Sequence, residues 1–260
     1  MSRRIEKTFA KGRPAFVAYI MGGDPDPATA QEVMNALPGA GVDIIELGFP
    51  FTDPMADGPA IEEAGIRARK GGTTLSSVIG MALTFRTTDQ NTTIILMGYA
   101  NPVYHMGCEA FSKLASEAGV DGAIIVDLPP EEDGPLRDAM DAEGMSLIRL
   151  ATPTTDANRL PKVVSGSSGF VYYVSMNGVT GGALASGGSV REQVARVKAA
   201  SNLPVVVGFG VRTPERASEI AREADGVVVG TAIVDALHKE GKDAALALVR
   251  SLADATHSTP

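Results

Sequence analysis

The architecture of this chain can be read outward from Val42-Asp43-Ile44-Ile45-Glu46-Leu47-Gly48-Phe49-Pro50-Phe51-Thr52-Asp53-Pro54-Met55-Ala56-Asp57-Gly58-Pro59. The first part of this stretch is mostly apolar, which predicts a buried strand of a parallel sheet. Glu46 is an ionisable group inside that strand, and burying it without a partner costs several kcal/mol. Catalysis is one reason to retain it, because loss of water raises the pKa of a carboxyl group towards neutrality.

The same pattern of an apolar run followed by an amphipathic stretch repeats along the chain, which is typical of strand–helix units around a parallel sheet. Strands are predicted near Ala15–Ile20, Asp43–Gly48, Thr93–Gly98, Gly122–Asp127, Met145–Leu150, Phe170–Ser175, Pro204–Gly208 and Gly226–Val229. Helices are predicted at Ala28–Leu37, Ala60–Lys70, Leu75–Arg86, Cys108–Ala118, Pro130–Glu143, Ala157–Val164, Val190–Ala200, Pro214–Ala224 and Lys242–Asp254. Eight units favour an α/β (β/α)8 TIM barrel over an open doubly wound sheet. The sequence also predicts an extra N-terminal helix before the barrel and an additional helix after strand 2.

Composition sets the domain count and limits the partners. The 260 residues, 44% of them hydrophobic, predict a single TIM-barrel domain over residues 1–260, with 255–260 as a frayed tail. A net charge of −8 without a lysine-rich run argues against nucleic acid or an anionic membrane as partner. No apolar run has the length of a membrane span. A single cysteine, Cys108, fits a reduced cytoplasmic enzyme.

Glycines cluster after the last three predicted strands. Gly181-Gly182, Gly208-Phe209-Gly210-Val211 and Gly230-Thr231 would let backbone N–H groups approach an anion, and a helix beginning at Thr231 would aim its positive end at it. Any one of these glycines alone could simply close a tight turn. Together they favour a phosphate site, since barrels frequently bind phosphate after strands seven and eight.

The other polar residues of this region have structural alternatives. Glu46 could form an internal ion pair with Arg149, and strand parity does not decide between the two interpretations. Asp57 could be the N-cap of the helix that starts near Pro59, a role that Asp53 could also take. Asp127 could be catalytic, but a role in bonding loop amides is favoured.

Several reaction types lack the residues they need. The lysines fall on predicted helices or surface turns, where a Schiff base would not form. His105, His238 and His257 are scattered, so no metal site is predicted. Gly208-Phe209-Gly210 lacks the third glycine of a dinucleotide fingerprint. Proton transfer by carboxylates on a phosphorylated substrate remains.

The chain resembles the alpha chains of tryptophan synthase. The resemblance rests on Glu46-Leu47-Gly48, Phe51-Thr52-Asp53-Pro54 and Ala56-Asp57-Gly58-Pro59, and continues in family order over nearly the whole length. It implies a lyase that cleaves indole-3-glycerol phosphate to indole and D-glyceraldehyde 3-phosphate by retro-aldol chemistry, in L-tryptophan biosynthesis. Two other classes stay open: an isomerase of the same pathway acting on a sugar phosphate, and a non-catalytic regulatory barrel.

The resemblance also implies site residues. Glu46 matches the acid–base glutamate and Asp57 the second catalytic carboxylate. Tyr172 matches a tyrosine near the glutamate, which would position that glutamate or the glycerol hydroxyls of the substrate. Substrate-binding candidates are Tyr19, Ile61, Met97, Tyr99, Ile124, Asp127, Thr180 and Phe209, and phosphate-binding candidates are Gly181, Gly210, Gly230 and Thr231. Thr180 belongs to a lid loop, Ser175–Gly188. Met176 occupies a lid position that is arginine in some relatives.

The family further implies a beta chain as partner, in an α2β2 heterotetramer. Pyridoxal phosphate belongs to that beta chain, so no cofactor is expected in this chain. The loop Pro50–Asp57 and the segment Asn101–Gly107 are expected at the interface between the two chains.

Overall fold

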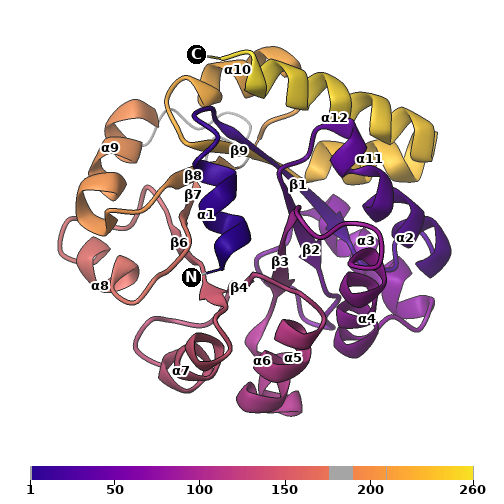
Figure 1. The fold of residues 1–260 in the computed structure, drawn as a ribbon, viewed down its shortest axis with the longest axis horizontal. Coiled ribbons are helices and arrows are strands. Elements are labelled where there is room, and N and C mark those ends of the chain that lie inside the picture. The colour runs from indigo at the N-terminus through magenta and orange to yellow at the C-terminus, as the bar shows by residue number, and fades with distance from the viewer. Residues whose placement is uncertain (1, 176–189, 209, 260) are drawn as a thin grey trace.

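The computed structural model describes residues 2–175, 190–208 and 210–259. Within these residues, nine parallel strands form one sheet: β1 (Ala15–Met21), β2 (Ile44–Gly48), β3 (Thr93–Gly98), β4 (Gly122–Ile125), β5 (Ser146–Leu147), β6 (Arg149–Ala151), β7 (Val171–Val174), β8 (Val205–Gly208) and β9 (Gly226–Val229). The strands surround a common centre and helices cover them on the outside (Figure 1). The predicted α/β barrel is confirmed.

The helices follow the strands in the expected alternation. They are α1 (Arg3–Phe9), α2 (Pro27–Ala36), the 3₁₀ turn η1 (Pro38–Ala40), α3 (Pro59–Lys70), α4 (Leu75–Phe85), α5 (Ala100–Met106), α6 (Cys108–Glu117), α7 (Gly134–Ala142), α8 (Leu160–Val164), α9 (Val190–Ser201), α10 (Pro214–Ala221), α11 (Thr231–Glu240) and α12 (Lys242–His257). The leading helix α1 and the second helix after β2, α4, are both present as predicted.

The strand predicted at Met145–Leu150 is two strands in the structure. β5 bonds to β4 and β6 bonds to β7, with only Ile148 between them. β1 pairs with both β2 and β9, so the run from β5 to β6 is where the two ends of the sheet meet. The barrel therefore closes at its fifth unit.

Two apolar layers hold the barrel together. The larger one lies between the strands and the outer helices and includes Phe16, Ile45 and Phe111. The smaller one fills the barrel interior with alternate strand residues such as Val17 and Ile44, as expected when successive side chains point to opposite faces. Helix α1 adds Ile5 to this inner layer and so closes the end of the barrel at which the strands begin.

Two predictions are corrected, and one helix is present that was not predicted. The helix predicted from Pro130 begins only at Gly134, because residues 129–132 form a turn. The segment Asn101–Gly107 belongs largely to a helix, α5, that the sequence did not suggest. Residues from 255 were expected to fray, but α12 continues to His257, and Thr256 and Thr259 are buried. The end of α12 is held because the Nε2 atom of His257 lies 2.8 Å from Asp43 Oδ2.

Candidate active site

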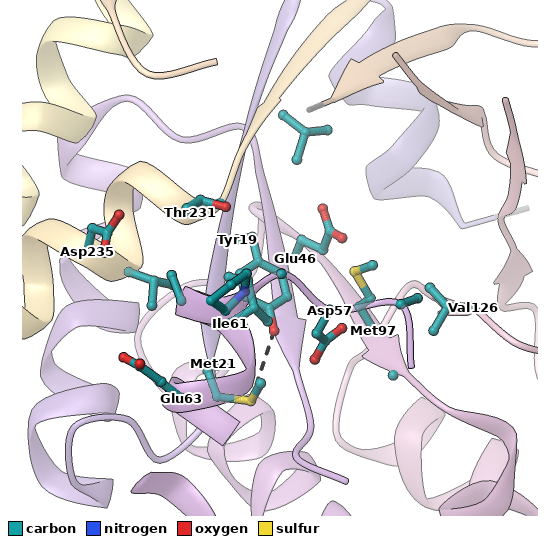
Figure 2. Close-up of a pocket in the computed structure, with 18 of the residues that line it drawn as sticks. Tyr19, Met21, Glu46, Asp57, Ile61, Glu63, Met97, Val126, Thr231 and Asp235 are labelled. Atoms are coloured by element: carbon teal, nitrogen blue, oxygen red, sulfur yellow. Dashed lines mark hydrogen bonds between the residues drawn. The ribbon is translucent and has the colours of Figure 1, made fainter. Parts of the chain in front are cut away.

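A cavity of about 600 Å³ opens where the strands end (Figure 2). This is the face at which barrels of parallel strands carry their chemistry. Ten of the predicted site residues line it: Tyr19, Glu46, Asp57, Ile61, Met97, Tyr99, Tyr172, Gly210, Gly230 and Thr231. The structure thus brings the two predicted acids and the described part of the predicted phosphate site into one chamber.

Glu46 points into this cavity from β2. It is in register with Tyr19 on β1 and Ile95 on β3, and Ile95 belongs to the inner layer of the barrel. The side chain is buried and its Oε2 atom has no hydrogen-bond partner. Burial raises the pKa of Glu46 to about 8. The carboxyl group therefore carries its proton at neutral pH and can release it near neutrality.

The alternative of an ion pair with Arg149 is excluded by the geometry. Arg149 is on β6, and its neighbours Ile148 and Leu150 are the residues that join the inner layer. Its guanidinium bonds to the carboxylate of Asp133 and to the carbonyl oxygens of Val163 and Ser165 instead. Among the described residues, no cation forms an ion pair with Glu46.

Asp57 lies in the loop between β2 and α3 and is half-buried. Its Oδ1 atom accepts a 2.8 Å hydrogen bond from the Tyr99 hydroxyl, which itself accepts one of 3.1 Å from the Ala56 N–H. Burial raises the pKa of Asp57, the bond from Tyr99 lowers it, and the charge of Glu62 raises it further, so that the net shift is upward. Tyr99 therefore holds this carboxylate in position and favours its ionised form against the effect of burial.

Asp57 is not a helix cap. The N-cap of α3 is Gly58, which has no side-chain capping bond. Asp53 accepts a 2.5 Å bond from the neighbouring Thr52 hydroxyl, so it acts within the loop. Both capping alternatives are therefore excluded, and the carboxylate of Asp57 stays available to the cavity.

Two tyrosines flank the acids, and glycines make room for them. A Cβ atom on Gly48 would lie 2.3 Å from the Tyr19 hydroxyl, and one on Gly208 would lie 2.2 Å from the Tyr172 hydroxyl. Burial raises the pKa of both tyrosines well above 10, with the carboxyl groups nearby adding to the effect. Both phenols therefore stay protonated and can donate hydrogen bonds to a ligand.

Two glycines of the predicted phosphate site, Gly210 and Gly230, also line the cavity. Gly210 has φ +73°, a conformation that other residues rarely adopt. Gly230 is the N-cap of the ten-residue helix α11, with no side-chain cap, and Thr231 is its first residue. Backbone N–H groups and the positive end of the helix dipole there favour an anion.

Some predicted residues do not line the cavity. Ile124 is fully buried in the inner layer of the barrel, in register with Met97. Asp127 accepts a 2.7 Å bond from the Ala100 N–H at the start of α5, which is the loop-amide role that the sequence favoured. Thr180, Gly181 and Phe209, with nearly all of the lid segment, lie outside the described residues.

The cavity also contains residues that the sequence reasoning missed. Met21 and Val126 follow Tyr19 and Ile124 by two positions, so strand alternation could have indicated them. Arg212 and Asp235 lie on the rim beside Gly210 and Thr231. Arg212 follows Gly210 by two residues, but a lone arginine in a loop gave no signal.

Comparison with known proteins assigns the family. The family model described as "Tryptophan synthase alpha chain" matches residues 5–258. The chain belongs to the tryptophan synthase alpha chain family. The predicted resemblance is thereby confirmed.

Solved structures agree with this family. Tryptophan synthase subunit alpha from Legionella pneumophila str. Paris is 38% identical, with a TM-score of 0.88 over 98% of this chain and 99% of that one. The aminoacrylate-bound form of tryptophan synthase from M. tuberculosis is 35% identical, with a TM-score of 0.89 over 98% and 100% of the two chains. Another structure of Mycobacterium tuberculosis tryptophan synthase, in space group F222, is 37% identical, with a TM-score of 0.89 over 98% and 96%.

Membership of this alpha chain family establishes the reaction. The protein is a lyase that cleaves indole-3-glycerol phosphate to indole and glyceraldehyde 3-phosphate in tryptophan biosynthesis. Alpha chains use no cofactor, and pyridoxal phosphate belongs to the beta chain. No group of three or more potential metal ligands occurs in the part of the chain that the structure describes. Among those same residues, no helix is long and apolar enough to cross a membrane.

Proposed function

We propose that Glu46 and Asp57 perform the cleavage of indole-3-glycerol phosphate as a pair of acid–base groups with separate roles. The observation that carries this proposal is the burial of Glu46, which has no ion-pair partner among the described residues and whose pKa burial raises to about 8. The protonated carboxyl delivers its proton to indole C3 and later accepts one from the glycerol hydroxyl beside the breaking bond. Protonated indole is the electron sink that accepts the electrons of that bond.

Asp57 takes the complementary role. Its Oδ2 atom is free of the bond from Tyr99, which occupies Oδ1, and it accepts the indole N–H. The ionised form stabilises the positive charge that develops on the ring. Tyr172 is a positioning residue beside Glu46, and Tyr19, Ile61 and Met97 supply the apolar wall for the ring.

The phosphate group is placed at Gly210, Gly230 and Thr231, with Gly181 as a fourth candidate. Support comes from the positive φ of Gly210 and the uncapped N-terminus of α11. Ile124 and Asp127 are not retained as direct contacts, since neither lines the cavity. Thr180 and Phe209 remain candidates on family likeness alone.

Glu46→Gln tests this assignment. The amide keeps the shape of the side chain but cannot carry the proton, so indole release should fall by at least about 10²-fold, while binding of indole-propanol phosphate is retained. Single-turnover indole formation and calorimetric titration measure the two quantities. Turnover within twofold of the parent protein would remove Glu46 from the mechanism.

We also propose a beta chain as partner, in an α2β2 assembly, in the cytoplasm, with residues 1–260 acting as one domain. Met55 and Tyr104, on the loop Pro50–Asp57 and on α5, are 84% and 45% exposed. The two segments adjoin, because Phe51 stacks on Tyr99 at the start of α5 with ring centroids 5.5 Å apart. The loop and the start of α5 therefore lie side by side next to Asp57, and each segment carries an exposed apolar side chain.

Met55→Asp should weaken association with a beta chain, and Leu83→Asp is the matched control, because Leu83 is also exposed but lies on α4. Sedimentation of alpha and beta mixtures measures the effect. Equal affinities for the two variants would place the interface elsewhere.

A further inference from the structure

Arg212 is a charged residue at the cavity rim that the mechanism above does not use. It follows Gly210 by two positions, and a guanidinium nitrogen of its side chain lies 3.4 Å from Asp235 Oδ2. Asp235 is four residues after Thr231 on α11, so the two lie on the same face of the helix, one turn apart. Figure 2 shows Thr231 and Asp235 on the same side of the cavity. The guanidinium is therefore held within about one turn of the proposed phosphate site.

Arg212 differs from the other arginine and lysine side chains that line the described part of the cavity. Arg67 makes two bonds, of 2.6 and 3.0 Å, to the buried carboxylate of Asp24. Lys239 is 2.8 Å from Asp235 Oδ1. The contact of Arg212 is at the long end of the hydrogen-bond range, and its side chain is 60% exposed. Of these three cations, Arg212 has the weakest interaction with its carboxylate partner.

The charges at this rim need a further positive group when substrate is present. A phosphate ester carries about −1.5 to −2 charge at neutral pH, whereas a helix N-terminus supplies only about half a unit charge. Asp235 places a negative charge one turn away, and Lys239 on the same helix compensates for it. Among the described arginine and lysine side chains of the cavity, Arg212 is the one without a close carboxylate partner of its own, and its planar guanidinium fits phosphate oxygens.

We propose that Arg212 binds the phosphate group of the substrate. Its guanidinium pairs with Asp235 while the cavity is empty and exchanges that carboxylate for the phosphate when substrate binds. This inference rests on the proposed placement of the phosphate at Gly210, Gly230 and Thr231. It makes Arg212 a determinant of affinity for phosphorylated ligands, and Asp235 its competitor.

A purely structural interpretation predicts a different result. If the pair only ties the loop after β8 to α11, removing either partner loosens the site and weakens binding. If Asp235 competes with phosphate for Arg212, the two substitutions act in opposite directions. Arg212→Gln weakens binding and Asp235→Asn strengthens it.

The experiment is a calorimetric titration with two ligands, indole-propanol phosphate and indole-propanol, which lacks the phosphate group. Arg212→Gln should weaken binding of the phosphorylated ligand by about tenfold, as expected for loss of a charge-assisted contact, and leave indole-propanol unchanged. Arg212→Lys should restore most of the loss. Asp235→Asn should tighten binding of the phosphorylated ligand by about twofold or more.

Arg216→Gln is the matched control. Arg216 lies on α10 and pairs with Glu219, and it does not line the cavity, so the net charge changes equally without a contact to the ligand. The proposal is overturned if Arg212→Gln acts like this control, if both ligands are weakened alike, or if Asp235→Asn weakens binding. A parent protein that does not prefer the phosphorylated ligand would refute the phosphate site itself, which is a separate outcome.

Discussion

At the scale of single residues, the chemistry depends on the carboxyl group of Glu46, whose pKa is raised because burial removes its contact with water. No cation faces Glu46 among the described residues, and Oε2 has no donor. With a pKa of about 8, about nine in ten of these groups carry a proton at pH 7. The empty protein therefore already holds the proton that indole C3 receives.

The pH dependence of the reaction follows from this protonation state. Raising the pH through about 8 ionises Glu46 and removes the proton donor, so kcat/KM for indole-3-glycerol phosphate should fall on the alkaline side of pH 8. Steady-state rates between pH 6 and 10, about the range that brackets this pKa, would show the fall. A rate that keeps rising to the top of this range would mean that the ionised form starts the reaction.

Glu46 also links stability to pH. Its pKa is raised from 4.5 when unfolded to about 8 when folded, so between these values the folded state binds more protons and loses stability as the pH rises. Glu46→Gln has no ionisable group at this position and so lacks this pH-dependent contribution to stability. The difference in melting temperature between Glu46→Gln and the parent protein should therefore grow from pH 5 to pH 8 in favour of the variant. A constant difference would show that water reaches the carboxyl group.

Tyr99 positions Asp57 without being a catalytic residue. Tyr99→Phe removes the 2.8 Å bond to Oδ1 and, with it, a contribution that lowers the pKa of Asp57. At low pH, protonation of Asp57 should lower kcat/KM, and in Tyr99→Phe this acidic limb of the profile should move to higher pH. We expect kcat to fall by about tenfold. Tyr104→Phe is the control, because the hydroxyl of Tyr104 donates to the Glu132 carbonyl oxygen at the surface and does not contact Asp57. An unshifted acidic limb would limit Tyr99 to packing.

At the scale of elements, strands β2 and β8 each carry a glycine at the position that faces a tyrosine ring. Gly48 accommodates Tyr19, and Gly208 accommodates Tyr172. The sequence suggested that Gly208 belongs to a phosphate cradle, whereas in the structure its missing side chain is the space that the phenol fills. Gly208 therefore determines where the Tyr172 ring lies, and Tyr172 in turn positions Glu46.

Gly208→Ala should displace Tyr172, since the added Cβ would lie 2.2 Å from its hydroxyl. A shift of about 1 Å in a positioning group can cost about 10²-fold in rate, so a loss of that order in kcat is expected. Gly80→Ala on α4 is the control, because nothing lies within 4 Å of its added Cβ, and it should keep full activity. Full activity in Gly208→Ala would show that the ring can move without consequence.

Local patterns predicted most of the fold, and distant contacts decided the rest. The runs of Val and Ile predicted all eight strand–helix units, because a buried strand is recognisable from the hydrophobicity of consecutive residues. The break at Ile148 depends on hydrogen bonds to two different strands, β4 and β7. Helix α5 depends on a bond from Ala100 N–H to Asp127, 27 residues away. The candidate acids were found from sequence, but their alternatives could be excluded only once the partners of Arg149 and the cap of α3 were known.

At the scale of the whole molecule, Asp43 joins segments from both ends of the chain. It is buried and lies 2.6 Å from Lys11, 2.8 Å from Arg13 and 2.8 Å from His257 on α12. Burial alone would raise its pKa, but bonds from His257, Arg13 and Lys11 outweigh burial and hold the pKa well below its usual range. This cluster lies at the start of β2, the strand that carries Glu46.

Asp43→Asn should destabilise the protein by about 1 to 3 kcal/mol near neutral pH, because it weakens charge-assisted hydrogen bonds to a buried carboxylate whose cationic partners are partly exposed. The sign of the pH dependence follows from the lowered pKa: the stabilisation by Asp43 is complete above its ordinary value of 3.8 and is lost as the pH falls below it. Urea unfolding of both proteins should show a gap at pH 7 that narrows below pH 4. A gap that does not depend on pH would point to packing rather than charge.

The position of His257 has a consequence for biosynthesis on the ribosome. Asp43 and His257 are 214 residues apart in sequence, so at typical translation rates the carboxylate emerges roughly ten to forty seconds before its histidine. Lys11 and Arg13 precede Asp43 and can hold it during that interval, so the first strands can pair while the remaining chain is still being translated. The last helix then locks an arrangement that the nascent chain has already begun.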